Sequence, residues 1–157
     1  MKIKTTLLKV VTLLLDCFTI LFGFMLTVGI ITSVHDGSIF TLQITTSIAL
    51  YLACLVVLSI SYCFFRIFNL MDTHQFFSEL SLHFVKSVRY LFITLFIVLL
   101  GTLPLVYYSA DHSDSPGVML IALAVIFVPL AIAAFVSVME KVLINSIQFK
   151  KENDLTI

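Results

Sequence analysis

Apolar residues fill four long stretches of the chain, and polar residues gather between these stretches and at both ends. The stretches cover residues 10–31, 44–65, 90–108 and 118–138. A transmembrane helix needs about 20 mostly apolar residues to cross about 30 Å of hydrocarbon, whereas strands of a membrane barrel are about ten residues long and alternate in polarity. The pattern therefore predicts an all-α integral membrane protein. We expect an antiparallel bundle of four transmembrane helices that forms one membrane domain over residues 1–157.

Positive charge lies on one side of this predicted membrane. All nine Lys and Arg residues fall before the first span, in the loop 66–89 or in the tail 140–157. The two remaining loops, residues 32–43 and 109–117, contain only acidic charges. Because cytoplasmic loops of membrane proteins carry an excess of Lys and Arg, the pattern predicts a multi-pass protein of the bacterial cytoplasmic (plasma) membrane. Its N-terminus and its C-terminus should both be cytoplasmic.

Composition supports the lipid bilayer as the main partner. Hydrophobic residues make up 61% of the chain and charged residues 11%, and the net charge is zero. Soluble domains have about 45–50% apolar and about 25% charged residues. A neutral chain has no basic field for direct nucleic acid binding. No nucleophile-elbow, zinc-protease, P-loop or dinucleotide motif occurs, and the histidines are scattered. We therefore expect no enzyme activity, no cofactor and no metal site.

One ionisable residue, Asp16, lies well inside a predicted span. Small and polar residues recur around it at spacings of three and four, which places them on one face of a helix. This polar stripe consists of Thr12, Asp16, Thr19, Gly23 and Thr27. Small residues and hydroxyls favour helix–helix packing in membranes, so the stripe is predicted to point into the bundle. Asp16 should lie about 10 Å below the inner interface, at 1.5 Å of rise per residue counted from Lys9.

Two interpretations of Asp16 stay open. It is either a structural pin, protonated or bonded to a hydroxyl such as that of Ser59, Ser61 or Ser137, or a site for proton or cation coupling. A separate feature lies in the fourth span, where Pro129 is predicted to kink the helix among small residues.

The loop 66–89 contains phenylalanines and a leucine at helical spacing. This pattern predicts a short amphipathic cytoplasmic helix between the second and third spans, with Asp72 or Thr73 as its cap. The tail continues the fourth helix and ends in a charged segment with an apolar close. Residues from both segments are candidates for partner docking: Phe76, Phe77, Leu80, Phe84, Asp154, Leu155 and Ile157.

Three stretches of the loop and the chain end resemble a known family. They are Phe65-Arg-Ile-Phe, Gln75-Phe-Phe-Ser and Val88-Arg-Tyr, followed by Glu152-Asn-Asp-Leu-Thr-Ile157 at the end. They are similar to motifs of the bacterial four-helix membrane family catalogued as domain of unknown function 2975. One departure is Asp72-Thr-His-Gln75, where that family more often has a turn with Gly and Pro. Because members are often encoded beside an Xre/Cro-type regulator, the resemblance implies a membrane partner of a helix-turn-helix transcription factor.

Three functions are consistent with these features. The first is a regulatory, sensory or anchoring partner of a cytoplasmic transcription regulator, as the resemblance implies. The second is a small proton-coupled exporter that uses Asp16, although the chain has no Trp and has a long middle loop. The third is an immunity protein against a membrane-active peptide. Each of these three functions is compatible with a homo-oligomer.

Overall fold

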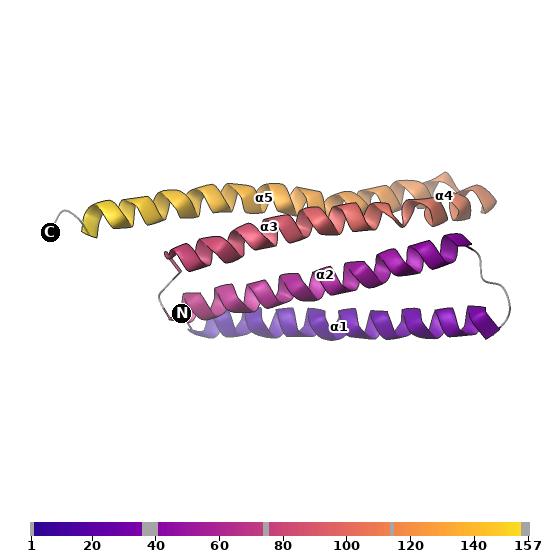
Figure 1. Cartoon of the computed structure of the whole chain (residues 1–157), viewed down its shortest axis with the longest axis horizontal. Coiled ribbons are helices and arrows are strands. Elements are labelled where there is room, and N and C mark those ends of the chain that lie inside the picture. Colours follow the sequence, from indigo (N-terminus) through magenta and orange to yellow (C-terminus); the bar gives the residue numbers. More distant parts are fainter. Residues whose placement is uncertain (1, 36–40, 74–75, 114, 155–157) are drawn as a thin grey trace.

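The computed structural model describes residues 2–35, 41–73, 76–113 and 115–154. Its helices are α1 (Lys2–His35), α2 (Thr41–Asp72), α3 (Glu79–Leu100), α4 (Leu103–His112) and α5 (Pro116–Asp154). All except α4 are long and apolar enough to cross a membrane. Figure 1 shows the four long helices side by side, with the chain direction alternating from each to the next. The predicted all-α membrane fold with four spans is confirmed.

The helices are longer than the bilayer requires. With 32 residues in α2 and 39 in α5, these helices measure about 48 and about 58 Å at 1.5 Å per residue, against about 30 Å of hydrocarbon. All nine Lys and Arg residues belong to the end of the molecule at which α1 begins, and we call this end the basic end. The helices therefore extend beyond the predicted spans at the basic end.

The segment predicted as a separate amphipathic helix does not form one. Instead, α2 continues to Asp72, and the chain enters α3 at Glu79 after a short non-helical link. Ser78 caps α3 from extended backbone, with its Oγ accepting a hydrogen bond from the Ser81 amide at 3.4 Å. No Gly or Pro stands between Leu80 and Leu100, so the amphipathic turns and the span fuse into one helix. The predicted cap at Asp72 or Thr73 is wrong for the same reason.

The third predicted span, residues 90–108, is broken in the half that lies away from the basic end. The amides of Gly101 and Thr102 bond to the carbonyls of Val98 and Leu99, three residues back, at 3.0 Å each. Pro104 follows in the first turn of α4. Proline lacks an amide hydrogen and its ring clashes with the carbonyl four residues earlier, so α3 ends at Leu100 and α4 begins afresh.

The four long helices pack in chain order, so the bundle is open. α1 packs on α2, α2 on α3, and α3 on α5, while α4 packs on α5 with a smaller contact to α2. Figure 1 accordingly places α1 and α5 at opposite sides of the row. Two clusters of buried residues lie along the α2–α3 seam: Ala53, Ile60 and Leu95 form one, and Cys63, Ile67 and Val88 form the other. These two clusters lie between α2 and α3, and further buried apolar residues, Ile126, Ala133 and Leu143, lie on α5.

Large apolar side chains cover the outside of this row. Phe18 of α1 is 70% exposed, and Leu120 and Phe135 of α5 are 69% and 68% exposed. An apolar surface this extensive is unfavourable in water and is ordinary in lipid. The bilayer thus covers the large apolar side chains that do not pack in the interior of the protein.

Candidate functional site

Asp16 is held by a hydroxyl of the neighbouring helix. Ser61 of α2 donates a hydrogen bond to Asp16 Oδ2 at 2.7 Å, and Ser61 is buried. The other carboxylate oxygen, Oδ1, is buried without a hydrogen-bond partner among the described residues. Ser61 is one of the three hydroxyls that the sequence analysis named. Ser59 is not the partner, because its hydroxyl bonds to the Leu55 carbonyl of its own helix.

The rest of the polar stripe also lies along the α1–α2 seam. Thr12, Thr19 and Gly23 are half-buried, and the Thr27 hydroxyl lies 2.8 Å from the Tyr51 hydroxyl of α2. Gly23, however, has no atom within 4 Å of the position that a Cβ would occupy. Asp16 and Thr27 therefore make the polar contacts of the stripe to α2, whereas the hydroxyls of Thr12 and Thr19 bond to carbonyls of α1 itself. The stripe does not use Gly23 for close backbone approach.

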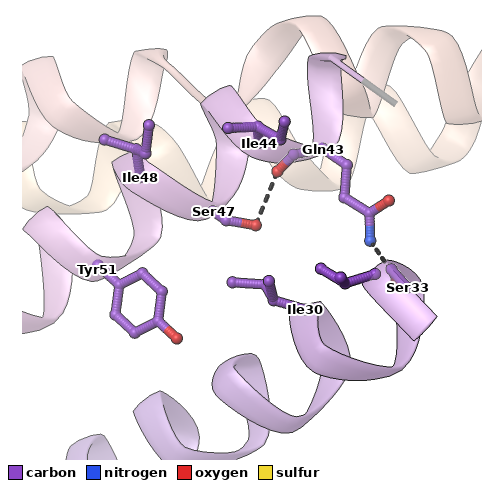
Figure 2. Close-up of a pocket in the computed structure, with 8 residues that line it drawn as sticks. Ile30, Ser33, Gln43, Ile44, Ser47, Ile48 and Tyr51 are labelled. Carbon is purple, nitrogen blue, oxygen red and sulfur yellow. Dashed lines mark hydrogen bonds between the residues drawn. The ribbon is translucent and has the colours of Figure 1, made fainter. Parts of the chain in front are cut away.

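The seam continues to the opposite end of α1 with polar residues that the sequence analysis did not select. Figure 2 shows Gln43 donating from Nε2 to Ser33 Oγ at 2.9 Å, and Ser47 donating to the Gln43 carbonyl at 2.7 Å. Ile30 and Tyr51 lie beside them around a hollow of about 280 Å³. Nothing in the spacing marked Gln43, because it lies just before the predicted second span.

A second polar contact joins α3 to α5. Arg89 Nη1 lies 2.8 Å from Glu140 Oε2, as an ion pair whose geometry is not that of a hydrogen bond. Glu140 is only 5% exposed. The Arg89 guanidinium also lies over the Tyr90 ring, 4.8 Å from its centre, where a cation is attracted to the ring face. This pair was not predicted from the sequence.

The two contacts lie at nearly the same height in the row. Ser61 stands between Ile60, which packs with Leu95, and Cys63, which packs with Val88. Arg89 directly follows Val88 on α3. We call Asp16, Ser61, Arg89 and Glu140 the polar layer. It crosses all four long helices at one level.

Two polar contacts set the lengthwise position of α1 against α2. Lys9 Nζ lies 2.6 Å from Asp72 Oδ2, beyond the end of the second predicted span, and Asp16 meets Ser61 inside that span. The depth of Asp16 below the inner interface stays a prediction.

Pro129 lies inside α5 and does not end it. Its side chain is buried, as are those of Ile126 and Ala133 one turn before and after. Proline is tolerated in membrane helices when neighbouring groups or small local adjustments satisfy the freed carbonyl. The continuation of α5 through Pro129 is therefore established, and the kink stays a prediction.

The candidate docking residues divide into two groups. Phe77 and Leu80 are 51% and 56% exposed. Phe76 and Phe84 are half-buried and pack against the cluster that contains Val88. In the tail, Asp154 ends α5, while Leu155 and Ile157 lie outside the described residues. Among the residues that the structure describes, no three His, Cys, Asp or Glu side chains converge on a metal position.

This fold and its spans define a multi-pass α-helical membrane protein. Residues 41–157 match the family model described as "Protein of unknown function (DUF2975)", and the chain belongs to this family, as the loop and tail motifs indicated. The chain is 34% identical over 110 residues to the "Uncharacterized membrane protein YoaS" of Bacillus subtilis (strain 168). The aligned region covers 70% of this chain and 69% of that protein. No solved structure shows a significant match. α1 precedes the matched region.

Replacing Ser61 with alanine is expected to lower the free energy of unfolding by about 1–2 kcal/mol. Hydrogen bonds between membrane helices average about 0.6 kcal/mol and reach about 1.7, and a carboxylate acceptor favours the upper end. Reversible unfolding of the purified protein in mixed micelles measures the change. Ser59→Ala is the matched control, because that exposed hydroxyl bonds within its own helix. Equal losses for the two variants would contradict a role for the Asp16 contact.

Proposed function

We propose that this protein is a non-enzymatic anchor that holds a cytoplasmic helix-turn-helix regulator at the bacterial plasma membrane. Both termini and the segment between α2 and α3 would face the cytoplasm, as the placement of the nine basic residues favours. The regulator is the partner that the family resemblance implies. In this arrangement the chain itself binds lipid and protein, and the regulator alone binds DNA.

One observation carries the proposal: a hollow of mixed polarity lies at the basic end between α3 and α5. Its volume is about 350 Å³. Its lining is polar and apolar in similar number, namely Glu79, Leu82, His83, Lys86, Ile144, Ile147 and Gln148. Transient protein–protein contacts have this balance of apolar core and polar rim. The exposed Leu80 lies on the adjacent turn of α3.

This hollow lies where a soluble protein would reach it. Eleven residues of α3 precede Tyr90, the first residue of the third predicted span, and these residues rise about 16 Å. The headgroup region on one side of a bilayer is only about 5–8 Å thick. The first turns of α3 and the end of α5 would therefore stand in the cytosol. The contact between α1 and α2 favours a structural role for Asp16 over an exporter, because Ser61 of α2 binds its carboxylate.

Photo-crosslinking in living cells tests the proposal. A benzophenone amino acid at Gln148, in the hollow, is expected to form an adduct with a soluble DNA-binding protein, and deletion of residues 150–157 is expected to weaken that adduct. The same probe at Tyr107, which is 65% exposed at the opposite end, is the control and should give none. Adducts to lipid alone at Gln148, or equal adducts at both positions, would reject the anchor.

A further inference from the structure

A long apolar groove runs along α2, α3 and α5 on a different side from the mixed hollow. Its volume is about 580 Å³. α2 and α5 form the two walls and α3 forms the floor, through Val85 and Val88. The walls contain Phe64, Ile67, Phe68 and Met71 on α2, and Ile132, Phe135, Val136, Met139, Val142, Leu143 and Ser146 on α5. Almost no polar atom is available in it to bind a charged or hydrogen-bonding ligand.

The groove crosses the level of the polar layer. Its upper part, at Ile132 and Phe135, lies on the hydrocarbon side of Glu140. Its lower part reaches Met71 and Phe77, which are 39% and 51% exposed and lie beyond the layer toward the basic end. Acyl chains can fill the upper part, but they do not extend past the headgroups. Exposed apolar surface of this kind marks a protein contact.

The wall that α5 contributes also bears an exposed apolar ridge. Phe135, Val138, Val142 and Phe149 follow one another at spacings of three, four and seven, so they share one helix face. They are 68%, 59%, 55% and 67% exposed, respectively. Phe135 and Val142 also line the groove, so the ridge is the crest of the α5 wall. The ridge and the groove therefore lie at the same height relative to the membrane.

We propose that the groove receives the α5 ridge of a second copy of this chain, in a two-fold symmetric dimer. Two copies inserted in the same direction can be related only by an axis along the membrane normal, so touching surfaces must lie at equal heights. The ridge and the groove meet that condition. Each copy would then place its ridge in the groove of the other, which makes the interface self-complementary as two-fold symmetry requires.

The groove and the ridge have the same length. The groove extends along α5 from Ile132 to Ser146 and the ridge from Phe135 to Phe149, and each covers about 21 Å. The side chains of one ridge can therefore lie along the whole groove of the other copy. This dimer does not depend on the proposed regulator.

Cysteine cross-linking of the full chain in native membrane vesicles tests the dimer. In a background without Cys17, Cys54 and Cys63, Val142→Cys is expected to form a disulfide-linked dimer at least tenfold faster than Tyr62→Cys. Tyr62 is the matched control, because it is 56% exposed against 55% for Val142, lies at a similar height, and stands on the opposite face of α2 from the groove. Equal rates for the two variants would overturn the proposal.

Introducing a charged residue on the ridge distinguishes a stable dimer from chance collisions of monomers in the membrane. Val142→Lys is expected to reduce the dimer fraction at least tenfold by native mass spectrometry or light scattering, whereas Tyr62→Lys is expected to leave it unchanged. Since Val142 is exposed in the single chain, its replacement should not unfold the protein, and circular dichroism checks this. If the chain is monomeric with lipid bound, the groove binds lipid. If a dimer forms but Val142→Lys leaves it unaffected, the dimer uses another surface and the groove has another partner. Either result overturns the proposal.

Discussion

Replacing Glu140 with glutamine is expected to lower the free energy of unfolding by about 3 kcal/mol. Glu140 is 5% exposed and pairs with Arg89 at 2.8 Å. Removing one partner of a buried ion pair leaves the other charge uncompensated, which costs about 3–5 kcal/mol. The low end applies because the Arg89 side chain is still 22% exposed and can reach water. Unfolding in mixed micelles, followed by helical circular dichroism, gives the measurement.

The double variant Arg89→Gln with Glu140→Gln is the informative control. Removing both charges removes the uncompensated one, so the pair of substitutions is expected to cost less than Glu140→Gln alone. Lys141→Gln, on the exposed neighbour of Glu140, controls for the loss of a charge near the same boundary and should change stability by less than about 0.5 kcal/mol. Additive losses in the double variant would show that Arg89 and Glu140 are not coupled.

Replacing Gly101 with leucine is expected to destabilise the protein by about 1–3 kcal/mol. A Cβ at Gly101 would lie 3.1 Å from the Ala49 Cβ of α2 and 3.1 Å from the Val98 carbonyl oxygen. Neither atom is the end of a flexible side chain, so α2 and α3 must separate locally, and overpacking of this kind costs about 1–3 kcal/mol. The same unfolding assay measures the loss.

Gly23→Leu provides a control with the same chemical change. It lies in α1, where a Cβ would meet nothing within 4 Å, so it is expected to leave stability nearly unchanged. If Gly23→Leu is as damaging as Gly101→Leu, the loss comes from the added bulk in lipid and not from the α2–α3 contact. A neutral Gly101→Leu would show that the helices are less closely packed than the Ala49 contact requires.

The spans and the family could be predicted because each depends on local sequence. Runs of about 20 apolar residues are long enough to cross the hydrocarbon of a bilayer. The motifs near Phe65 and Glu152 indicated the family without any knowledge of how the helices pack. The lengthwise position of α1 could not be predicted, because an apolar helix can slide along its neighbour with little change in buried area. Its position is fixed by Lys9 with Asp72 and by Asp16 with Ser61.

Three further features show where local pattern and structure diverge. Arg89 and Glu140 meet only because α3 and α5 are adjacent, and no periodicity within one helix marks such a pair. Pro104 was visible in the sequence, but its effect depended on Gly101 and Thr102 adopting a tight turn before it. The amphipathic spacing near Leu80 and Phe84 was real, yet with no interruption it extended the span instead of forming a separate helix.

The edge position of α1 has a consequence for how the protein responds to its membrane. Neither buried cluster includes a residue of α1, and hydrogen bonds and an ion pair join α1 to α2 at Asp16, Thr27, Ser33 and Lys9. Hydrogen bonds strengthen when water is withdrawn and weaken when it enters. Hydration of the bilayer boundary thus acts first on the joint between α1 and the remainder, making the first helix the part most responsive to thinning or swelling of the membrane.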